Sequence, residues 1–224
     1  MSRWLVHVLV VAAVVALGVA FAVSRRHVID PAIHDRYARA LRNMAALDAT
    51  LNDEVLQADK GIVRHYDPVV HTLGELRRIP SSLRGAPKFL SVEGRAEVER
   101  DVALFVEGLR DKEELIEQFK SEAAVLRNSL HYFPIAADAF ERAANDPREA
   151  MLAEQLLRHL LLYNQRPDRD LRDLVDADLA KLRGQAPRRA DDGRQLLTTH
   201  ATVILERRPQ VDALLKRIGE LPTA

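Results

Sequence analysis

The sequence predicts an all-α protein, in which an N-terminal transmembrane helix precedes antiparallel helical bundles that form two stacked helical modules. Three observations support this fold class. Apolar residues recur at steps of three and four through most of the chain, as they do on one face of an α-helix. Only 9 of the 224 residues are glycine and only 5% are aromatic, which favours helices over sheets. Residues 4–23 form an almost unbroken apolar run.

This apolar run is long enough to cross a membrane. A helix of about 20 residues rises roughly 30 Å, the thickness of the hydrocarbon core, and Trp4 lies where an interfacial aromatic residue is typical. We therefore expect residues 1–27 to form a membrane anchor. A cleaved signal peptide is the alternative, because Ala20-Phe21-Ala22 fits a cleavage site. Either interpretation places the remainder of the chain outside the cytoplasm.

The first long helix is expected to begin at Asp30-Pro31, where aspartate can cap a helix and proline can take its first position. Its apolar stripe runs from Ile33 to Ile62 at steps of three and four. Asp67-Pro68 should end this helix and begin a short second one, since a residue before proline avoids the α region. Residues 79–87, rich in Pro, Ser and Gly, are expected to form a loop.

The most regular stripe in the chain predicts a coiled-coil-like helix that bends or ends at Pro134. All of its positions except Lys112 are apolar. They are Val102, Phe105, Leu109, Lys112, Ile116, Phe119, Ala123, Leu126, Leu130 and Phe133. We expect the segment that follows to separate one module, residues 28–140, from a second module, residues 141–224.

The second module is expected to contain helices separated by prolines and glycines. Asp146-Pro147 opens a leucine-rich helix that breaks before Pro167. The next helix should end at Gly184, and Pro209 should interrupt the last one.

Composition and motifs exclude several classes of function. Lys+Arg and Asp+Glu both number 33, so the net charge is zero and nothing indicates a nucleic-acid binder. Cysteine is absent, which excludes disulfides, thiolate metal sites and cysteine nucleophiles. No phosphate-binding loop and no zinc-protease or serine-hydrolase motif occurs. We predict no catalytic residues, no metal site and no cofactor.

Residues 51–68, LNDEVLQADKGIVRHYDP, contain the candidate binding residues of the first helix. Asp59 follows Val55 by four positions, so it lies on the buried stripe or at its edge. Asn52 and Tyr66 border the same face. A carboxylate that faces a core needs a partner.

The helix with the regular stripe offers such partners, because Arg127 borders the stripe and Lys120 and Asn128 are near it. Two interpretations remain open. One is a buried polar pair that fixes the helix register. The other is a pocket between helices with a few convergent polar groups. For a pocket, the predicted ligand-binding residues are Asn52, Asp59, Tyr66, Arg127 and Asn128.

Two blocks of the chain resemble the double all-helical ligand-binding domain, the DAHL family. The blocks are LNDEVLQADKGIVRHYDPVV and FKSEAAVLRNSLHYFP, and the likeness extends from about Asp30 to the C-terminus. Domains of this family lie outside the cytoplasmic membrane in bacterial sensor histidine kinases, VirA-like kinases among them, and in related receptors. Asp59 and Ala123 depart from the family pattern, in which an arginine and an asparagine are usual.

The resemblance implies a sensing domain and not an enzyme. Such a domain would bind a small molecule or a periplasmic binding protein and relay helix motion to the membrane. We expect a single-pass protein of the bacterial inner membrane, with the helical modules in the periplasm and a homodimer as the working state. The second membrane helix and the signalling module of such receptors are missing from the sequence, so the chain is either a fragment of a longer receptor or a single-pass anchored protein.

The alternative function is a membrane-anchored, non-catalytic helical scaffold for protein-protein interaction. The surroundings of Asp59 distinguish the two functions. A cavity of several hundred Å³, the usual scale of ligand sites, would favour a sensor. A closed ion pair in a solid core would favour a scaffold.

Overall fold

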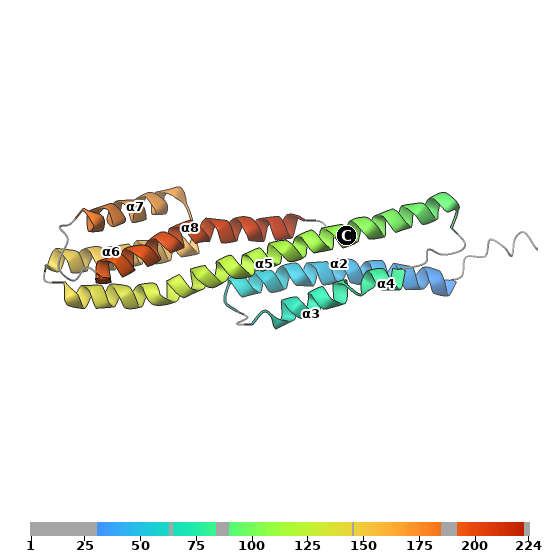
Figure 1. Cartoon of the computed structure of the whole chain (residues 1–224), viewed down its shortest axis with the longest axis horizontal. Coiled ribbons are helices and arrows are strands. Elements are labelled where there is room, and N and C mark those ends of the chain that lie inside the picture. Colours follow the sequence, from blue (N-terminus) through green and yellow to red (C-terminus); the bar gives the residue numbers. More distant parts are fainter. Residues whose placement is uncertain (1–30, 63–64, 84–89, 145, 185–191, 222–224) are drawn as a thin grey trace, which may run out of the picture. The chain divides into compact units, whose positions relative to one another are not determined.

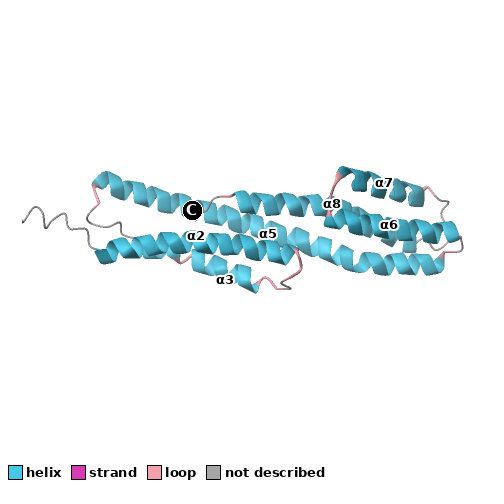
Figure 2. Cartoon of the chain, turned by 180° about the vertical axis from the view of Figure 1, so that it is seen from behind, coloured by secondary structure: helices cyan, strands magenta, loops and turns pink. Residues whose placement is uncertain are grey.

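Most of the residues that the structure describes are helical, and turns connect the helices. The computed structural model describes residues 31–62, 65–83, 90–144, 146–184 and 192–221 (Figure 1). No strand occurs among these residues (Figure 2). The predicted all-α class is confirmed.

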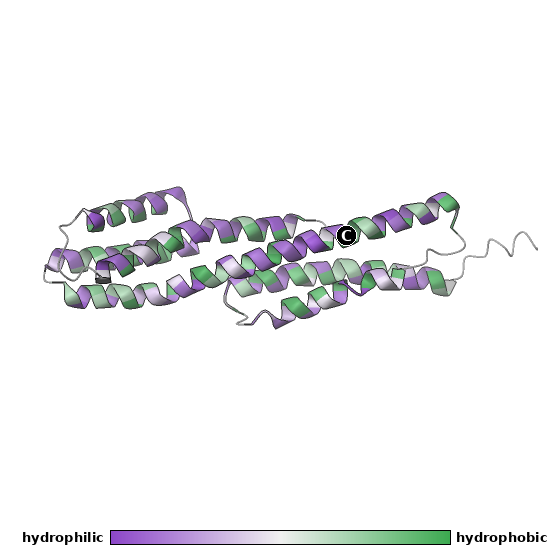
Figure 3. Ribbon diagram, viewed as in Figure 1, coloured by the Kyte–Doolittle hydropathy of each residue, from purple (hydrophilic) through white to green (hydrophobic). Residues whose placement is uncertain are grey.

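No helix in the described ranges is both long and apolar enough to span a membrane. These helices carry hydrophobic and hydrophilic residues on different sides (Figure 3). The predicted span, residues 4–23, lies outside the described residues. The membrane anchor therefore stays a prediction.

The described residues form two compact units, and two long helices contribute to both. Unit 1 holds residues 31–54 and 65–110, and unit 2 holds residues 55–62 and 111–221. The shared helices are α2 (Pro31–Asp59) and α5 (Val92–Ala143). The sequential division into modules of residues 28–140 and 141–224 stays a prediction.

Unit 1 packs the first part of α2 with α3 (Asp67–Leu76), α4 (Ile79–Leu83) and the first part of α5. The Tyr37 hydroxyl donates a hydrogen bond of 2.9 Å to the Leu83 carbonyl, which ties α2 to α4. The buried apolar side chains are Met44, Leu51, Val69, Leu73, Leu76, Ile79, Leu83, Phe105 and Leu109. The loop predicted over residues 79–87 is wrong for its first part, because burial of apolar side chains turns that part into α4.

Unit 2 packs α6 (Pro147–Gln165), α7 (Arg169–Arg183) and α8 (Asp192–Glu220) with the second part of α5 (Figure 1). The Asp146 carboxylate accepts a hydrogen bond of 2.9 Å from the backbone N–H of Arg148, so the predicted cap of α6 is confirmed. The fully buried side chains of this unit include Ile116, Phe119, Phe133, Leu156, Leu160, Leu182, Leu197, Ile204 and Ile218.

Eight of the ten positions in the regular stripe of α5 are buried as predicted, and Val102 and Leu130 are half-buried. Its fully or nearly fully buried members are Phe105, Leu109, Lys112, Ile116, Phe119, Ala123, Leu126 and Phe133. Even Lys112, the polar member, has an exposed fraction of 0%. Helical spacing therefore identified the core face of this helix.

Pro134 was predicted to bend or end its helix and Pro209 to interrupt its helix, and neither proline ends one. Helix α5 continues through Pro134, and α8 continues through Pro209. Proline has no N–H for the carbonyl four residues back. For Pro209 this carbonyl belongs to Leu205, and it accepts a hydrogen bond of 3.5 Å from the Arg172 guanidinium of α7. A neighbouring helix thus replaces the bond that the proline removes.

Helix α2 ends at Asp59, earlier than the predicted end near Asp67. The turn after it contains Gly61, the one residue of the described chain with a positive φ. Ile62, which the spacing placed on the buried stripe, is 72% exposed because the helix has already ended. Asp67 is the first residue of α3 and not its cap, a position that Tyr66 takes without a side-chain hydrogen bond.

A pair of leucines on α6 tests which face is the core. Leu156→Ala should lower the free energy of unfolding by about 2–5 kcal/mol, because it removes a side chain with 0% exposure and leaves a cavity. Leu162→Ala, at a position 46% exposed on the same helix, should change it by less than about 0.5 kcal/mol. Urea unfolding followed by circular dichroism measures both values. Equal losses would contradict the assigned core face.

Candidate functional site

A polar cavity of about 210 Å³ lies within unit 2. The C-terminal end of α2, the middle of α5, the end of α6 and the middle of α8 form its walls. The lining residues are Asp59, Lys60, Gly61, Ala123, Leu126, Arg127, Leu130, Asn164 and Arg208. Two sequence blocks that carried the family resemblance therefore contribute to one cavity.

The backbone turn at Gly61 shapes the first wall. Its φ of 69° lies in the left-handed region, which glycine adopts without steric cost. The Gly61 N–H donates to the Ala58 carbonyl at 3.2 Å, and the Ile62 N–H donates to the Gln57 carbonyl at 3.1 Å. This pair of bonds is a Schellman motif, which satisfies the last carbonyls of a helix. It ends α2 at Asp59 and places the end of the helix on the cavity wall.

Asp59 forms a bidentate ion pair with Arg208 of α8. The two Arg208 Nη atoms lie 3.2 and 3.4 Å from the two Asp59 carboxylate oxygens, and the Asp59 side chain is only 5% exposed. Two parallel hydrogen bonds fix the relative orientation of both planar groups. We had expected the partner of Asp59 among α5 residues such as Arg127, and this expectation is wrong, because the partner comes from α8.

Arg208 is shared between two carboxylates. Its Nε donates to Asp212 Oδ1 at 3.0 Å, and its Nη2 also contacts that oxygen. Burial alone would lower the pKa of the Arg208 guanidinium, but hydrogen bonds and charge interactions with Asp212 and Asp59 outweigh burial and raise this pKa. The guanidinium therefore keeps its charge and neutralises Asp59.

Arg127 extends from α5 to the end of α2. Its Nη2 donates a hydrogen bond of 3.4 Å to the Ala58 carbonyl, in the last turn of α2. The C-terminus of a helix carries partial negative charge, so a guanidinium is favourable there. Arg127 thus fixes one wall of the cavity and also contributes positive charge to its lining.

Asn164 contributes an unsatisfied acceptor. Its Oδ1 is buried and has no hydrogen-bond partner in the described part of the chain. A buried polar atom without a partner costs about 1–3 kcal/mol, and each such atom in a native structure calls for an explanation. A donor on a bound ligand would provide the missing hydrogen bond.

The charges of the lining favour an anion. Lys60, Arg127 and Arg208 are basic and Asp59 is acidic, but Arg208 is engaged by Asp59 and Asp212. Lys60 and Arg127 therefore supply the positive charge of the lining that can attract an anion. None of the lining side chains is a serine, histidine or tyrosine, so the cavity suits recognition better than nucleophilic chemistry. Within the described ranges, no group of three or more His, Asp or Glu side chains could hold a metal ion.

The structure brings together some of the predicted binding residues and not others. Asp59 and Arg127 line the cavity. Asn128 also belongs to unit 2, but its side chain is exposed and does not line the cavity. Asn52 and Tyr66 belong to unit 1. Tyr66 does not lie on the helix face that carries Asp59, because α2 already ends at Asp59. A role for any of the five in binding stays a prediction.

Sequence reasoning missed Arg208 and Asn164. No local pattern marks Asn164. Because the sequence predicts that Pro209 interrupts the last helix, it does not place the neighbouring Arg208 in the middle of that helix. A signal did exist for the end of α2, because Lys60-Gly61 after an apolar stripe is typical of a helix C-terminus.

The Asp59–Arg208 pair should stabilise unit 2. We expect Asp59→Ala to lower the free energy of unfolding by about 1–3 kcal/mol, less than the loss of an isolated buried pair, because Asp212 still compensates Arg208. Arg208→Met alone should cost more, about 3–5 kcal/mol, because it leaves the buried Asp59 carboxylate without its partner. Denaturant titrations measure each value.

Asp138→Ala is the matched control, because Asp138 pairs with Arg142 and both are exposed. It should cost no more than about 1 kcal/mol. A stability of Asp59→Ala equal to that of the unaltered chain would contradict a structural role for the pair.

Comparison with known proteins identifies the family. No solved structure matches the chain. The sequence model of the DAHL domain matches residues 29–224, which covers all of the described helices. The chain therefore belongs to the DAHL domain family, whose members are sensor-type ligand-binding domains and not catalytic ones.

Proposed function

We propose that this chain is the extracytoplasmic ligand-sensing domain of a bacterial transmembrane receptor, and that its ligand is a small organic anion bound in the polar cavity of unit 2. The observation that supports this most is the cavity itself, whose lining includes the basic side chains of Lys60 and Arg127 and the amide of Asn164, whose buried oxygen is unsatisfied. Both positions at which the sequence departs from the family pattern, Asp59 and Ala123, line it. These two departures therefore change side chains that line the proposed ligand site.

The size of the cavity supports a metabolite-sized ligand. A volume of about 210 Å³ equals about seven water molecules at roughly 30 Å³ each. It is below the roughly 300–1,000 Å³ of drug-sized sites. A short carboxylic acid with a hydroxyl group fits these limits, because the carboxylate can contact Arg127 or Lys60 and the hydroxyl can donate to Asn164.

A ligand in this cavity would contact the end of α2. Helix α2 begins at Pro31, directly after the predicted membrane segment, and continues without interruption to Asp59. A ligand shifts an equilibrium only by its difference in affinity for two states. An anion near Lys60 and Arg127 provides such a difference, because it draws positive charge away from the carbonyls at the C-terminus of α2. We infer that motion of α2 carries the signal toward the membrane.

The binding proposal is tested with lactate, malate and succinate. In thermal-shift and calorimetric titrations of the full chain in nanodiscs, at least one acid should stabilise the protein by about 2.7 kcal/mol at a hundred times its dissociation constant. Arg127→Ala should weaken that binding by about ten- to a hundredfold, the value of a hydrogen bond to a charged group.

Arg142→Ala provides the control, because Arg142 is an arginine of the same helix with 75% side-chain exposure outside the cavity. It should leave the affinity unchanged. Equal weakening by both substitutions would indicate general electrostatic attraction. Absence of binding by all three acids would instead support the alternative, an anchored scaffold for a protein partner.

We propose that the chain spans the membrane once, at residues 4–23, and that its helical units lie in the periplasm. We also propose that two copies of the chain form a homodimer. The chain has no cysteine, so Arg142→Cys introduces one thiol at an exposed position. A membrane-impermeant maleimide should label this thiol in intact bacteria after permeabilisation of the outer membrane alone. Labelling only after lysis of the inner membrane would contradict a periplasmic location.

A further inference from the structure

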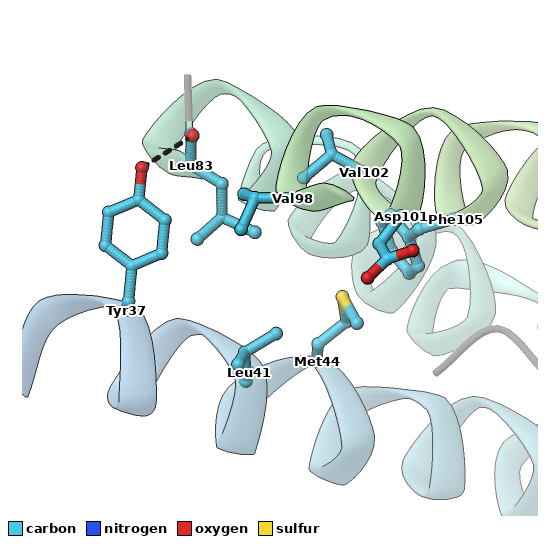
Figure 4. Close-up of a pocket in the computed structure, with 8 residues that line it drawn as sticks. All are labelled: Tyr37, Leu41, Met44, Leu83, Val98, Asp101, Val102 and Phe105. Atoms are coloured by element: carbon cyan, nitrogen blue, oxygen red, sulfur yellow. Dashed lines mark hydrogen bonds between the residues drawn. The ribbon is translucent and has the colours of Figure 1, made fainter. Parts of the chain in front are cut away.

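Unit 1 contains a second cavity, of about 150 Å³, whose chemistry is the opposite of that in unit 2. It lies between α2, α4 and the first part of α5 (Figure 4). Its lining consists of Tyr37, Leu41, Met44, Leu83, Val98, Asp101, Val102 and Phe105. All of these except Asp101 are apolar or aromatic.

The cavity interrupts a core stripe. Tyr37, Leu41 and Met44 follow one another at steps of four and three on α2, and Figure 4 shows them facing α4 and α5. Met44 is buried, but Leu41 is 52% exposed although it belongs to the same stripe. Leu41 therefore lines an open space, and Leu83, Val98 and Val102 form the wall across from it (Figure 4).

Apart from the Asp101 carboxylate, the walls have no unsatisfied polar group that would call for water. The Tyr37 hydroxyl is engaged with the Leu83 carbonyl at 2.9 Å, so its ring carbons form the wall. Leu83 and Phe105 are buried and add hydrocarbon surface. Its volume of about 150 Å³ matches that of an apolar cavity that accepts a molecule of the size of benzene.

Asp101 gives this apolar site its specificity. It is the one charged residue of the lining, and its side chain is exposed at the mouth. In the described ranges no hydrogen bond or ion pair engages its carboxylate, which points from α5 toward α2 (Figure 4). A carboxylate beside an apolar cavity favours a ligand that combines a hydrocarbon body with one positive charge.

We propose that unit 1 carries a separate binding site for a small apolar amine. The ring or branched hydrocarbon of the amine occupies the cavity against Met44 and Phe105, and its ammonium group pairs with Asp101. This site is distinct from the anion site in unit 2, since the two share no residue. The chain then responds to two compounds of opposite charge.

The test uses the full chain in nanodiscs of zwitterionic lipid, with 4-fluorobenzylamine as the probe and empty nanodiscs as the blank. Fluorine NMR line broadening should show saturable binding that unlabelled benzylamine displaces. Asp101→Asn should weaken the binding about threefold to fivefold, as expected for one ion pair at a partly exposed position. Glu99→Gln, an exposed acid of the same helix outside the lining, should leave it unchanged within twofold.

Two further measurements distinguish the contribution of the apolar cavity from that of the Asp101 charge. Leu41→Trp should abolish binding because the indole fills the cavity, and the half-exposed position tolerates a larger side chain. The neutral analogue 4-fluorobenzyl alcohol should bind the unaltered chain and Asp101→Asn equally. None of these variants should change the binding of organic acids in unit 2.

The proposal is overturned by any of three results. One is the absence of saturable binding, and another is equal affinity of the amine for the unaltered chain and Asp101→Asn. The third is full binding by Leu41→Trp in a chain that keeps its helical circular dichroism. The last result would place the amine in the lipid or elsewhere on the protein.

Discussion

The structure depends on one constraint, which is that a single long helix must supply core surface to two compact units. Helix α5 meets this constraint with one stripe that alternates steps of three and four from Phe105 to Phe133. A shift of this apolar pattern by one residue would expose apolar side chains to solvent. The stripe is buried even at Lys112, where the hydrocarbon part of the side chain takes the place of an apolar residue. The other helices add their own stripes to this one.

Within unit 2, the polar cavity exists because charged groups occupy places where apolar groups would close the core. Arg208 lies between Asp59 and Asp212, and their planar ion pairs hold a space open that Ala123 is too small to fill. The cavity of unit 1 is lined instead by apolar and aromatic side chains, with Asp101 as its one charged residue. The two cavities therefore differ in the chemistry of their walls, which is why the proposed ligands differ.

The sequence predicted what depends on helical periodicity and failed where tertiary packing decides. The core face of α5, the cap at Asp146 and the helical class all followed from spacing and capping. Pro209 was misjudged because the replacement donor, Arg172, comes from another helix. The partner of Asp59 lies 149 residues away in sequence, a distance over which no local pattern carries information. The cavity in unit 1 could not be predicted either, because residue spacing identifies an apolar stripe but not whether other side chains pack against it.

The Schellman turn at Gly61 separates the backbone bonds that end α2 from the side chains that give the cavity wall its charge. Backbone bonds end α2 there, and the exposed side chain of Lys60 does not define the course of the chain. Charge at position 60 can therefore vary without rebuilding the domain, whereas Asp59 is held by its ion pair with Arg208. Such modularity makes a receptor evolvable: a new compound can be recognised by exchanging a few side chains on an unchanged frame.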